Sequence, residues 1–554
     1  MRAGSIPASL QSLHGYTLRA FGHDVVAGVT VGLVALPLAM AFAIASGLTP
    51  QSGIYCAVIT GFIISALGGS RCQIGGPTGA FVVVVAGIIA QHGVNGLFMC
   101  TMMAGVILVI LGATGMGTAV NYLPRPVVVG FTNGIAVLIA STQVKDFLGL
   151  EISNVPAQFA GRMAALAGHL DTVSWTAAAL GISALAVILA MRRFVPAVPG
   201  TIVALVGGTA VVMITGLQTE TIGTRFGGIP SGLPPVHLPH FEAHLIPPLL
   251  GPALTVAMLG AIESLMSAVV ADRMSGDRHN PNVELVAQGI ANISSPIFGG
   301  LPATGAIART ATNIRSGART PVAGMIHAVT LLVVLLAGAP LARFIPLAVL
   351  AAILLVVAYN MGEWHEIPKL LRLTKTDISV WIVTFALTVF ADLTIAVEVG
   401  MILAALLFIR RVSVTTTVSQ VTSDYVESGR PHILQDKKIP PFVTIFRIHG
   451  PFLFGMTDKI NSIIDQLADL PPVVIVRLRN MTAIDATGLR ALEDLADQLR
   501  ASGRTLVLCG ALEQPAALME AAEFHRHVGD RNICANIEEA LKRADECAAI
   551  PPVA

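Results

Sequence analysis

Apolar stretches of about 20 residues, the length of helix that crosses roughly 30 Å of hydrocarbon, recur from Val25 to about Ile409 and then stop. The first seven predict membrane spans near residues 24–45, 53–68, 77–91, 95–115, 125–143, 174–192 and 197–216. A polar stretch rich in Gly and Pro follows, and seven more spans are predicted near 249–271, 283–299, 304–316, 320–340, 345–361, 377–391 and 394–411. The pattern predicts an α-helical polytopic membrane protein with fourteen spans.

This pattern divides the chain into six parts. We expect a cytoplasmic N-terminal segment (1–23), a first seven-span repeat (24–216), an extracytoplasmic connection (217–248), a second seven-span repeat (249–411), a linker (412–439) and a soluble domain (440–545). In the soluble part, strand-like runs such as 473–476 and 505–508 alternate with amphipathic helices such as 487–500, which is typical of a small α/β domain.

Positive residues set the orientation, because Lys and Arg collect in cytoplasmic loops. With the N-terminus inside, the outer loops hold only Lys145, Arg162, Arg225 and Arg343. The inner loops hold Arg71, Arg125, Arg192, Arg193, Arg273, Arg278, Arg315, Arg319, Lys369, Arg372, Lys375, Arg410 and Arg411. We therefore expect a multi-pass protein of the cell (inner) membrane with both termini in the cytoplasm.

Composition agrees with a chain that lies mostly within a membrane, since 54% of its 554 residues are hydrophobic and 12% are charged. The net charge of +1 gives no basic field for nucleic acid, so we expect no nucleic-acid partner. The six cysteines have no metal-ligand spacing, and no nucleophile and base share a motif. We expect no metal, no cofactor and no enzyme activity.

The two sets of seven spans resemble each other internally. Thr78-Gly79-Ala80 opens the third span after a proline, and Thr304-Gly305-Ala306 opens the tenth after a proline. Leu123-Pro124 and Ile345-Pro346 then enter the fifth and twelfth spans at similar distances downstream. Because seven is odd, the second repeat is inverted relative to the first, as in many secondary transporters.

The third and tenth spans are too short to cross as helices, since the 14 or so residues from Thr78 to Gln91 rise only about 21 Å. The preceding segments, 72–76 and 295–301, carry Gly and Pro, so we expect extended backbone at membrane depth, which is tolerated where it lines a cavity. Each half-helix start presents free N–H groups and about half a positive charge. Two starts that face each other predict an anion site. Close helix crossing on small residues is the alternative.

Two ionisable residues sharpen this site, because charges inside spans are costly and usually functional. Arg309 lies five residues into the tenth span and can complement an anion. Glu263 lies among apolar residues of the eighth span and is expected to bind protons reversibly. The alternative is a structural ion pair, either between the two or with a partner at an interface.

Several motifs together resemble the sulfate permease family, the anion transporters that include prestin and pendrin. They are Pro50-Gln51-Ser52-Gly53-Ile54-Tyr55, Gly75-Gly76-Pro77-Thr78, the run 130–134, the run 143–149, the Glu263 span and the Arg309 segment. The resemblance covers essentially the whole chain. It implies fourteen spans in two inverted repeats, divided into a core domain (spans one to four and eight to eleven) and a gate domain, often in a homodimer.

The resemblance also places the anion between the third and tenth spans. By matching motifs, the substrate-binding residues would be Phe42, Thr78, Gly79, Ala80 and Phe81, together with Thr304, Gly305, Ala306, Ala308 and Arg309. Ala308 stands where some animal members have a serine, so a hydroxyl contact is missing. Glu at position 263 is similar to members coupled to protons, whereas Ser267, one turn on, leaves a sodium site open.

The implied function is secondary active transport of a small anion, by proton symport and alternating access. The Glu263 and Arg309 segments look most like bacterial members that take up four-carbon dicarboxylates such as succinate or fumarate, and sulfate remains open. Sodium-coupled bicarbonate transport, anion exchange or an anion channel are alternatives. A nucleobase:proton symporter would more naturally place acidic partners, not arginine, at the tenth span.

In the soluble domain, Asp485-Ala486-Thr487-Gly488-Leu489 at a strand-to-helix turn looks like the loop of the STAS domain. In related anti-sigma factor antagonists a serine is phosphorylated where Thr487 stands, so Asp485 and Thr487 are candidate regulatory residues. A cytoplasmic protein partner of this domain is possible on the same grounds. The simpler interpretation is that Asp485 or Thr487 caps the helix.

Overall fold

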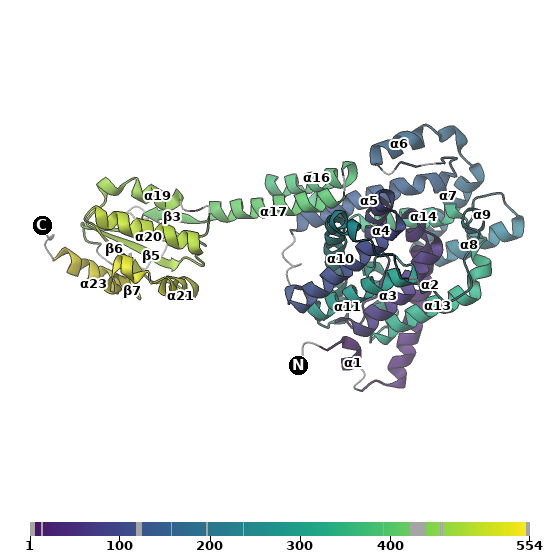
Figure 1. Cartoon of the computed structure of the whole chain (residues 1–554), viewed down its shortest axis with the longest axis horizontal. Coiled ribbons are helices and arrows are strands. Elements are labelled where there is room, and N and C mark those ends of the chain that lie inside the picture. The colour runs from purple at the N-terminus through teal and green to yellow at the C-terminus, as the bar shows by residue number, and fades with distance from the viewer. Residues whose placement is uncertain are drawn as a thin grey trace. The chain divides into compact units, whose positions relative to one another are not determined.

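The computed structural model describes residues 6–12, 15–117, 124–153, 155–156, 158–195, 198–236, 238–391, 393–420, 439–454, 456 and 458–549 (Figure 1). Three short helices, α1 (Ala8–Ser12), α6 (Phe159–Ala167) and α9 (Ile222–Phe226), lie outside the predicted spans. The first seven predicted spans correspond to α2 (Leu18–Ala45), α3 (Pro50–Leu67), α4 (Gly79–Ala113), α5 (Arg125–Leu148), α7 (Trp175–Phe194) and α8 (Gly200–Thr215). Helix α4 contains both the third and the fourth predicted span. Gly93, with a φ of 69°, interrupts the helical backbone between them.

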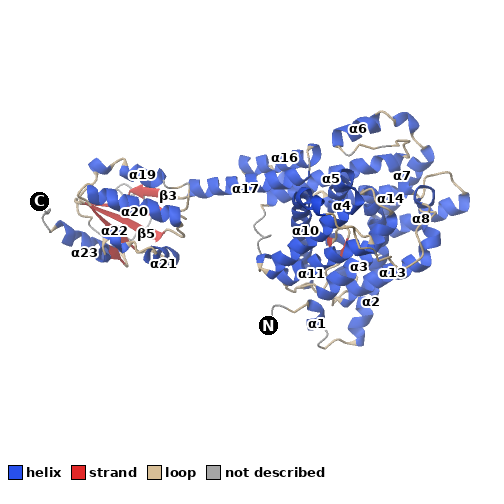
Figure 2. Cartoon of the chain, in the orientation of Figure 1, coloured by secondary structure: helices blue, strands red, loops and turns tan. Residues whose placement is uncertain are grey.

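The second set contains α10 (Ile246–Ser275), α11 (Pro281–Ser294), α12 (Ile307–Arg315), α13 (Val322–Ala342), α14 (Leu347–Met361), α16 (Lys375–Phe390) and α17 (Leu393–Thr415). The short helix α15 (Ile367–Leu370) precedes α16. Each of the fourteen predicted spans therefore has a helix in the same order, and helices dominate this part of the chain (Figure 2). Among the described residues, eight helices are long and apolar enough to cross a membrane. The prediction of an α-helical polytopic membrane protein is confirmed.

A two-residue strand precedes each half-helix. Strand β1 (Gly75–Gly76) pairs antiparallel with β2 (Thr304–Gly305), with Gly75 opposite Gly305 and Gly76 opposite Thr304. Both strands favour glycine, because a Cβ at Gly305 would lie 1.7 Å from Gln73 Nε2 and displace this buried side chain, and Gly76 has a φ of 151°. The expected extended segment 295–301 differs in part, because residues Ser295–Phe298 form a 3₁₀-helix.

Side chains satisfy the backbone groups around the strand pair, as they must at membrane depth. Asn292 makes two 2.8 Å hydrogen bonds with Ala303, donating to its carbonyl and accepting from its N–H. Asn313 donates to the Cys72 carbonyl at 2.9 Å, and the Thr310 hydroxyl accepts from Ile74 N–H at 3.0 Å. These contacts hold the two half-helix starts next to each other.

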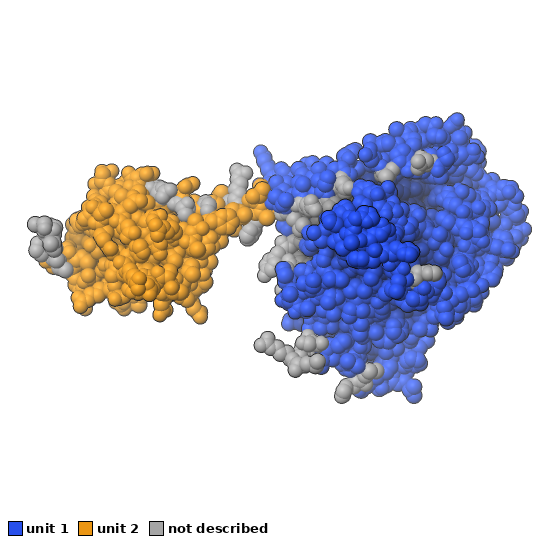
Figure 3. Space-filling model, in the orientation of Figure 1, with its two compact units in different colours: residues 1–404 blue, residues 405–554 orange. Residues whose placement is uncertain are grey.

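The chain forms two compact units, residues 1–404 and 405–554 (Figure 3). The second unit has a five-stranded sheet in the order β3 (Thr417–Gln420), β4 (Val443–His449), β5 (Val473–Asn480), β6 (Thr505–Cys509) and β7 (Ile533–Cys534). Strand β3 is antiparallel to β4, and the remaining pairs are parallel. Because β3 lies within the expected linker 412–439, the sheet begins earlier in the chain than residue 440. Residues 421–438 of that linker lie outside the described residues.

Alternating residues of the central strand β5 give this sheet two buried faces. Val474, Val476 and Leu478 pack with helix α20 (Ala486–Ala501) and α19 (Asp458–Ile464). Val473 and Ile475 pack on the other face with α23 (Ile537–Ala548). Helices α21 (Glu513–Ala521) and α22 (His525–Val528) complete this α/β unit, as its alternating sequence pattern predicts.

Candidate functional site

A cavity of about 360 Å³ lies where helices α4 and α12 begin. Most of its lining is apolar, which is typical of small-molecule sites that use few polar groups. Helices α2, α5, α10 and α14 supply the other walls, and the lining residues include Phe42, Thr78, Gly79, Thr132, Glu263, Ala306, Ala308, Arg309, Asn360 and Glu363.

The start of α4 leaves its helical N–H groups uncapped by a side chain. Thr78 is the N-cap residue with extended backbone (φ −126°, ψ 160°), but its hydroxyl does not bond to the helix. It donates instead to Glu263 Oε2 at 2.9 Å, across to helix α10. The first N–H groups of α4 therefore keep their positive end available at the cavity.

The start of α12 is uncapped for a different reason. Its N-cap residue is Ala306, whose methyl group cannot accept a hydrogen bond. Ala306 N–H donates to the Ile74 carbonyl at 2.8 Å, which fixes this helix start against the residue before β1. Two helix N-termini without side-chain caps thus line one cavity, an arrangement that favours an anion.

Arg309 lies one turn inside α12 and is only 2% exposed. Its Nη2 donates to the Pro77 carbonyl at 2.6 Å, whereas its Nη1 is buried and has no hydrogen-bond partner among the described residues. The guanidinium therefore lies behind the two helix starts, where its charge adds to the positive potential at the cavity.

Glu263 is half-buried in α10 and accepts a hydrogen bond from the Thr78 hydroxyl. In the described part of the chain it forms no ion pair with Arg309, so an ion pair between the two is not what the structure has. One cavity therefore contains two helix starts, one cation set back from the surface and one carboxyl group bonded to a helix-start residue.

The structure separates the sequence-predicted residues into two groups. Phe42, Thr78, Gly79, Ala306, Ala308, Arg309 and Glu263 line the cavity, and Ala80, Phe81, Thr304, Gly305 and Ser267 do not. Ala80 is fully buried, and the Phe81 ring packs toward Gly260 of α10. The Ser267 hydroxyl is buried and lies 3.0 Å from the Thr310 hydroxyl, so it belongs to the contacts around β1.

The two Thr-Gly-Ala tripeptides are not structurally equivalent. Thr304 and Gly305 form strand β2, and the Thr304 hydroxyl donates to the Gly260 carbonyl at 2.8 Å. Thr78 is instead an N-cap, so its counterpart in the second repeat is Ala306. The match between the two tripeptides is therefore wrong as a structural alignment. The two half-helices correspond through the strands β1 and β2 that precede them.

Sequence reasoning missed the wall opposite the half-helices. It consists of residues at the start of α5, including Val127 and Thr132, and of Asn360 and Glu363 at the end of α14. Thr132 lies in the run 130–134, which carries the family resemblance but does not indicate where these residues lie in the fold. Nothing in the sequence indicates that the end of α14 meets the start of α12.

The candidate regulatory residues lie at the start of α20. Asp485 Oδ1 accepts from Gly488 N–H at 2.8 Å, and Oδ2 accepts from Phe454 N–H at 2.9 Å. Asp485 is thus the helix cap, as the simpler interpretation expects. Thr487 is exposed in the first turn of the helix.

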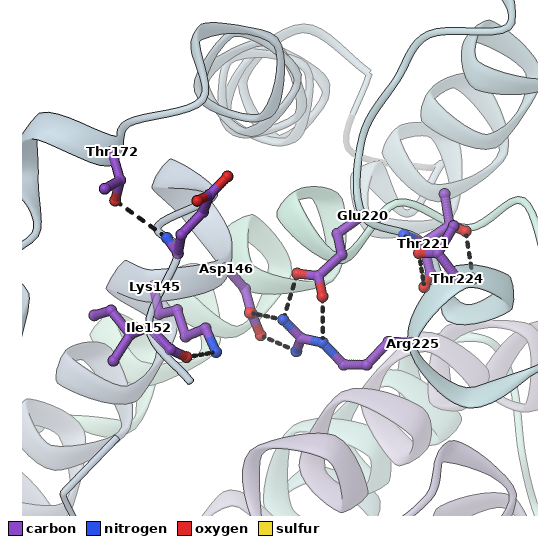
Figure 4. Close-up of polar contacts among 9 residues, drawn as sticks. Lys145, Asp146, Ile152, Thr172, Glu220, Thr221, Thr224 and Arg225 are labelled. Carbon is purple, nitrogen blue, oxygen red and sulfur yellow. Dashed lines mark hydrogen bonds and ion pairs between the residues drawn. The ribbon is translucent and has the colours of Figure 1, made fainter. Parts of the chain in front are cut away.

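A polar cluster away from the cavity fixes the end of α5 (Figure 4). Arg225 donates to both carboxylate oxygens of Asp146, at 2.7 and 3.2 Å, and also to Glu220. Burial works against the charged form of Arg225, but the hydrogen bonds to Glu220 and Asp146 outweigh it and raise the pKa. Lys145 Nζ donates to the Ile152 carbonyl at 2.5 Å. The run 143–149 therefore stabilises the connection between the repeats.

Comparison with known proteins agrees with this architecture. Residues 21–384 match the Sulfate permease family and residues 435–540 match the STAS domain. The "Putative sulfate transporter YvdB" of Bacillus subtilis (strain 168) is 41% identical over 94% of this chain and 97% of its own. The bicarbonate transporter BicA of Picosynechococcus sp. is 31% identical over 94% of each chain.

The fold matches a solved structure as well. Murine Solute Carrier 26 family member A9, an anion transporter solved in its inward-facing state, superposes with a TM-score of 0.86 over 98% of this chain and 94% of that chain, at 17% identity. The family match covers more than half of the chain, and the relatives match over nearly their whole length. The chain therefore belongs to the sulfate permease family, whose members are membrane anion transporters and not enzymes.

Proposed function

We propose that the chain is a proton-coupled symporter that moves a small dianion, sulfate or a four-carbon dicarboxylate such as succinate or fumarate, by alternating access. The main support for the proposal is the hydrogen bond from Thr78, at the start of α4, to Glu263 of α10. It connects the group that would bind the proton to the backbone that would bind the anion.

The charges around the cavity support a dianion. Two helix starts contribute about half a positive charge each, and Arg309 contributes one more, so these groups sum to about +2. Ionised Glu263 reduces that sum to about +1, and a proton on Glu263 restores about +2. Proton binding therefore matches the wall to a second negative charge on the substrate.

The Thr78 hydroxyl supplies the coupling. An ionised carboxylate can only accept, so it takes the hydroxyl proton of Thr78 as its hydrogen-bond donor. A protonated Glu263 can donate to Thr78 instead, which frees the hydroxyl proton to donate to the anion. One proton on Glu263 thus adds a charge and a donor to the same site.

The positive residues near the walls support a site that faces the cytoplasm. The cavity lies between the start of α5, whose first residue is Arg125, and the end of α14, which is followed by Lys369, Arg372 and Lys375. Under this proposal α2–α4 and α10–α13 form the core that carries the anion past the remaining helices, in a homodimer of the inner membrane with cytoplasmic termini.

Sodium-coupled bicarbonate transport is the second candidate, because BicA is a relative over nearly the whole chain. Its support is weaker at the cation site, since the Ser267 hydroxyl lies against Thr310 and does not line the cavity. A monoanion would match the wall with Glu263 ionised.

The test is uptake by the purified full chain in liposomes, with sulfate, succinate, fumarate and bicarbonate compared, each with and without an inward proton gradient and a sodium gradient. Proton-driven uptake of a dianion is expected. Uptake that ignores the proton gradient would refute symport, and sodium-dependent bicarbonate uptake would favour the second candidate.

Two matched variants test the coupling group. Glu263 and Glu363 both line the cavity, but only Glu263 bonds to Thr78. Glu263→Gln should abolish stimulation by the proton gradient, and Glu363→Gln should retain it. Full stimulation in Glu263→Gln would remove the coupling role.

A further inference from the structure

A second cavity, of about 310 Å³, lies between helices α8 and α13. Helix α2 packs against both of these helices and contributes Leu36 and Met40 to the walls, and Ile54 of α3 lines the cavity as well. None of the described residues that line this cavity also lines the anion cavity. The transport mechanism proposed above therefore gives the second cavity no role.

The walls of this cavity are almost entirely apolar. Among the described lining residues only Thr209 has a polar side chain, and its hydroxyl donates to the Leu205 carbonyl of its own helix at 2.7 Å. That hydroxyl is therefore already satisfied within α8. A cavity lined in this way holds water poorly and binds apolar molecules instead.

The cavity is a groove that opens on the outside of the helices. Its lining residues Val206 of α8 and Leu341 of α13 are apolar and yet 61% and 57% exposed. Gly338 leaves space between them, because a Cβ added there would meet only Val334 Cγ1, at 3.6 Å. Since α13 is long and apolar enough to span a membrane, the molecules available to fill this groove are lipids.

A cation lies next to the groove. Arg343 directly follows the lining residue Ala342, and a Cβ added at Gly228 would lie 3.9 Å from the Arg343 Cβ. The side chain is exposed, its guanidinium carbon lies 4.6 Å from the centroid of the Phe344 ring, and it forms no ion pair with another described residue. A guanidinium binds phosphate oxygens in a two-pronged geometry, so Arg343 complements a phosphate at this end of the groove.

We propose that the groove between α8 and α13 is a binding site for one membrane phospholipid, with an acyl chain in the cavity and the phosphate on Arg343. The lining residues of α13 run from Val334 to Ala342, a rise of about 12 Å, which suits an extended chain better than a compact apolar solute. Arg343 belongs to the outer loops in the predicted orientation. The lipid is therefore one of the outer leaflet.

The position of the groove gives the lipid an effect on transport. Under the proposed alternating access, α2, α3 and α13 move with the anion and α8 does not. An acyl chain between them can follow that movement, whereas a rigid bulky side chain in the same place would resist it. This effect rests on the proposed function, but lipid binding itself does not.

The direct test is photo-crosslinking of the purified full chain in liposomes that contain phosphatidylglycerol with a diazirine in its acyl chain. Peptide mass spectrometry should find the label concentrated on groove residues such as Met213, and about tenfold less of it on the exposed apolar Ile110 of α4, as for a difference of about two buried methylene groups. Label spread evenly over both positions would overturn the proposal.

Variants that fill the groove from opposite walls make this test specific. Gly338→Phe and Val206→Trp should each lower the label on the groove about tenfold, because either ring occupies the space of the acyl chain. Val329→Phe is the matched control, since Val329 is an exposed apolar residue of α13 that does not line the groove. Thermal unfolding identifies the variants that fold, and unchanged groove label in a folded Gly338→Phe or Val206→Trp protein would overturn the proposal.

The headgroup contact is tested by comparing diazirine-labelled phosphatidylglycerol with the corresponding phosphatidylethanolamine. The wild type should prefer the anionic lipid about fivefold, as expected for one basic residue near the membrane surface. Arg343→Gln should lose this preference, and Arg343→Lys should keep it. A wild-type preference in Arg343→Gln would refute the contact between Arg343 and the phosphate.

Transport assays separate this proposal from the proposed function. Gly338→Phe should slow uptake relative to Val329→Phe and leave equilibrium binding of sulfate and succinate unchanged, because the groove is separate from the anion cavity. If the wild type binds neither anion while the groove is labelled, the proposed function fails and the lipid site stands. If anion binding is normal and the groove is not labelled, only the lipid site fails.

Discussion

The contribution of the Arg309 charge to anion binding can be tested directly. Its Nη1 is buried and its Nη2 is held by Pro77, so we expect it to act on the anion through its charge more than through a direct hydrogen bond. A unit charge about 6 Å away, at an effective dielectric of about 20, contributes about 3 kcal/mol. Arg309→Gln should therefore weaken anion binding about a hundredfold.

A lysine separates charge from geometry at the same position. Arg309→Lys keeps the cation but has a single ammonium group, so it should retain the affinity to within about tenfold if charge dominates. If directional hydrogen bonds dominate, lysine and glutamine should be equally poor. Both variants leave the Pro77 carbonyl with a weaker partner or none, at a cost of about 1–3 kcal/mol of stability.

The assay is equilibrium binding of the transported anion to purified full-length protein, with thermal unfolding measured on the same samples. Arg162→Gln is the matched control, because Arg162 is also buried (6% exposed) and bonds to a hydroxyl and a carbonyl, away from the cavity. Unchanged affinity in folded Arg309→Gln, or an equal loss in Arg162→Gln, would refute the reasoning.

Three further predictions concern a buried glycine, a helix cap and a buried tyrosine. Gly305→Ala should lower the unfolding temperature, because its Cβ would displace the buried Gln73 amide from Ser264. Gly87→Ala in α4, which has open space, should gain up to about 1 kcal/mol. Thermal unfolding separates these outcomes, and an unchanged unfolding temperature in Gly305→Ala would contradict the packing around β2. Asp485→Ala should cost about 0.5–2 kcal/mol of STAS-domain stability in thermal unfolding, with exposed Thr487→Ala as the control and equal losses as the contrary result. Burial and then the hydrogen bond to Asp24 raise the pKa of Tyr16 to about 12. The contribution of Tyr16 to the free energy of unfolding is therefore complete below its usual pKa of about 10 and is lost as pH rises through 12. Measured at about pH 9–12, the free energy of unfolding should fall with pH in the wild type and fall less in Tyr16→Phe.

Hydropathy predicted the order of the helices because crossing a bilayer requires a length of apolar chain that can be read directly from the sequence. The half-helix starts were also predictable, because Gly75, Gly76 and Pro77 exclude a regular helix before Thr78. The sequence also predicted the break in α4 at Gly93, as the boundary between the third and fourth spans. These features depend on neighbours in the chain.

The parts that could not be predicted depend on neighbours in space. Thr304 has the same letters around it as Thr78, yet it is a strand residue, because pairing with Gly76 takes precedence over capping. Phe81 lies close to Thr78 in sequence but turns away from the cavity with the helix, toward Gly260. The lining by Asn360 and Glu363 requires the packing of two repeats, which no local pattern encodes.

The pairing of β1 with β2 has a consequence for which substitutions the residues around it tolerate. Main-chain hydrogen bonds make no demand on side-chain chemistry beyond the space that Gly75 and Gly305 leave. The side chains around this strand pair can therefore change while the register of β1 and β2 stays the same, provided that residues 75 and 305 remain small. Equivalent positions at the two helix starts are found by aligning the strands, which matches Thr78 with Ala306 as N-cap residues.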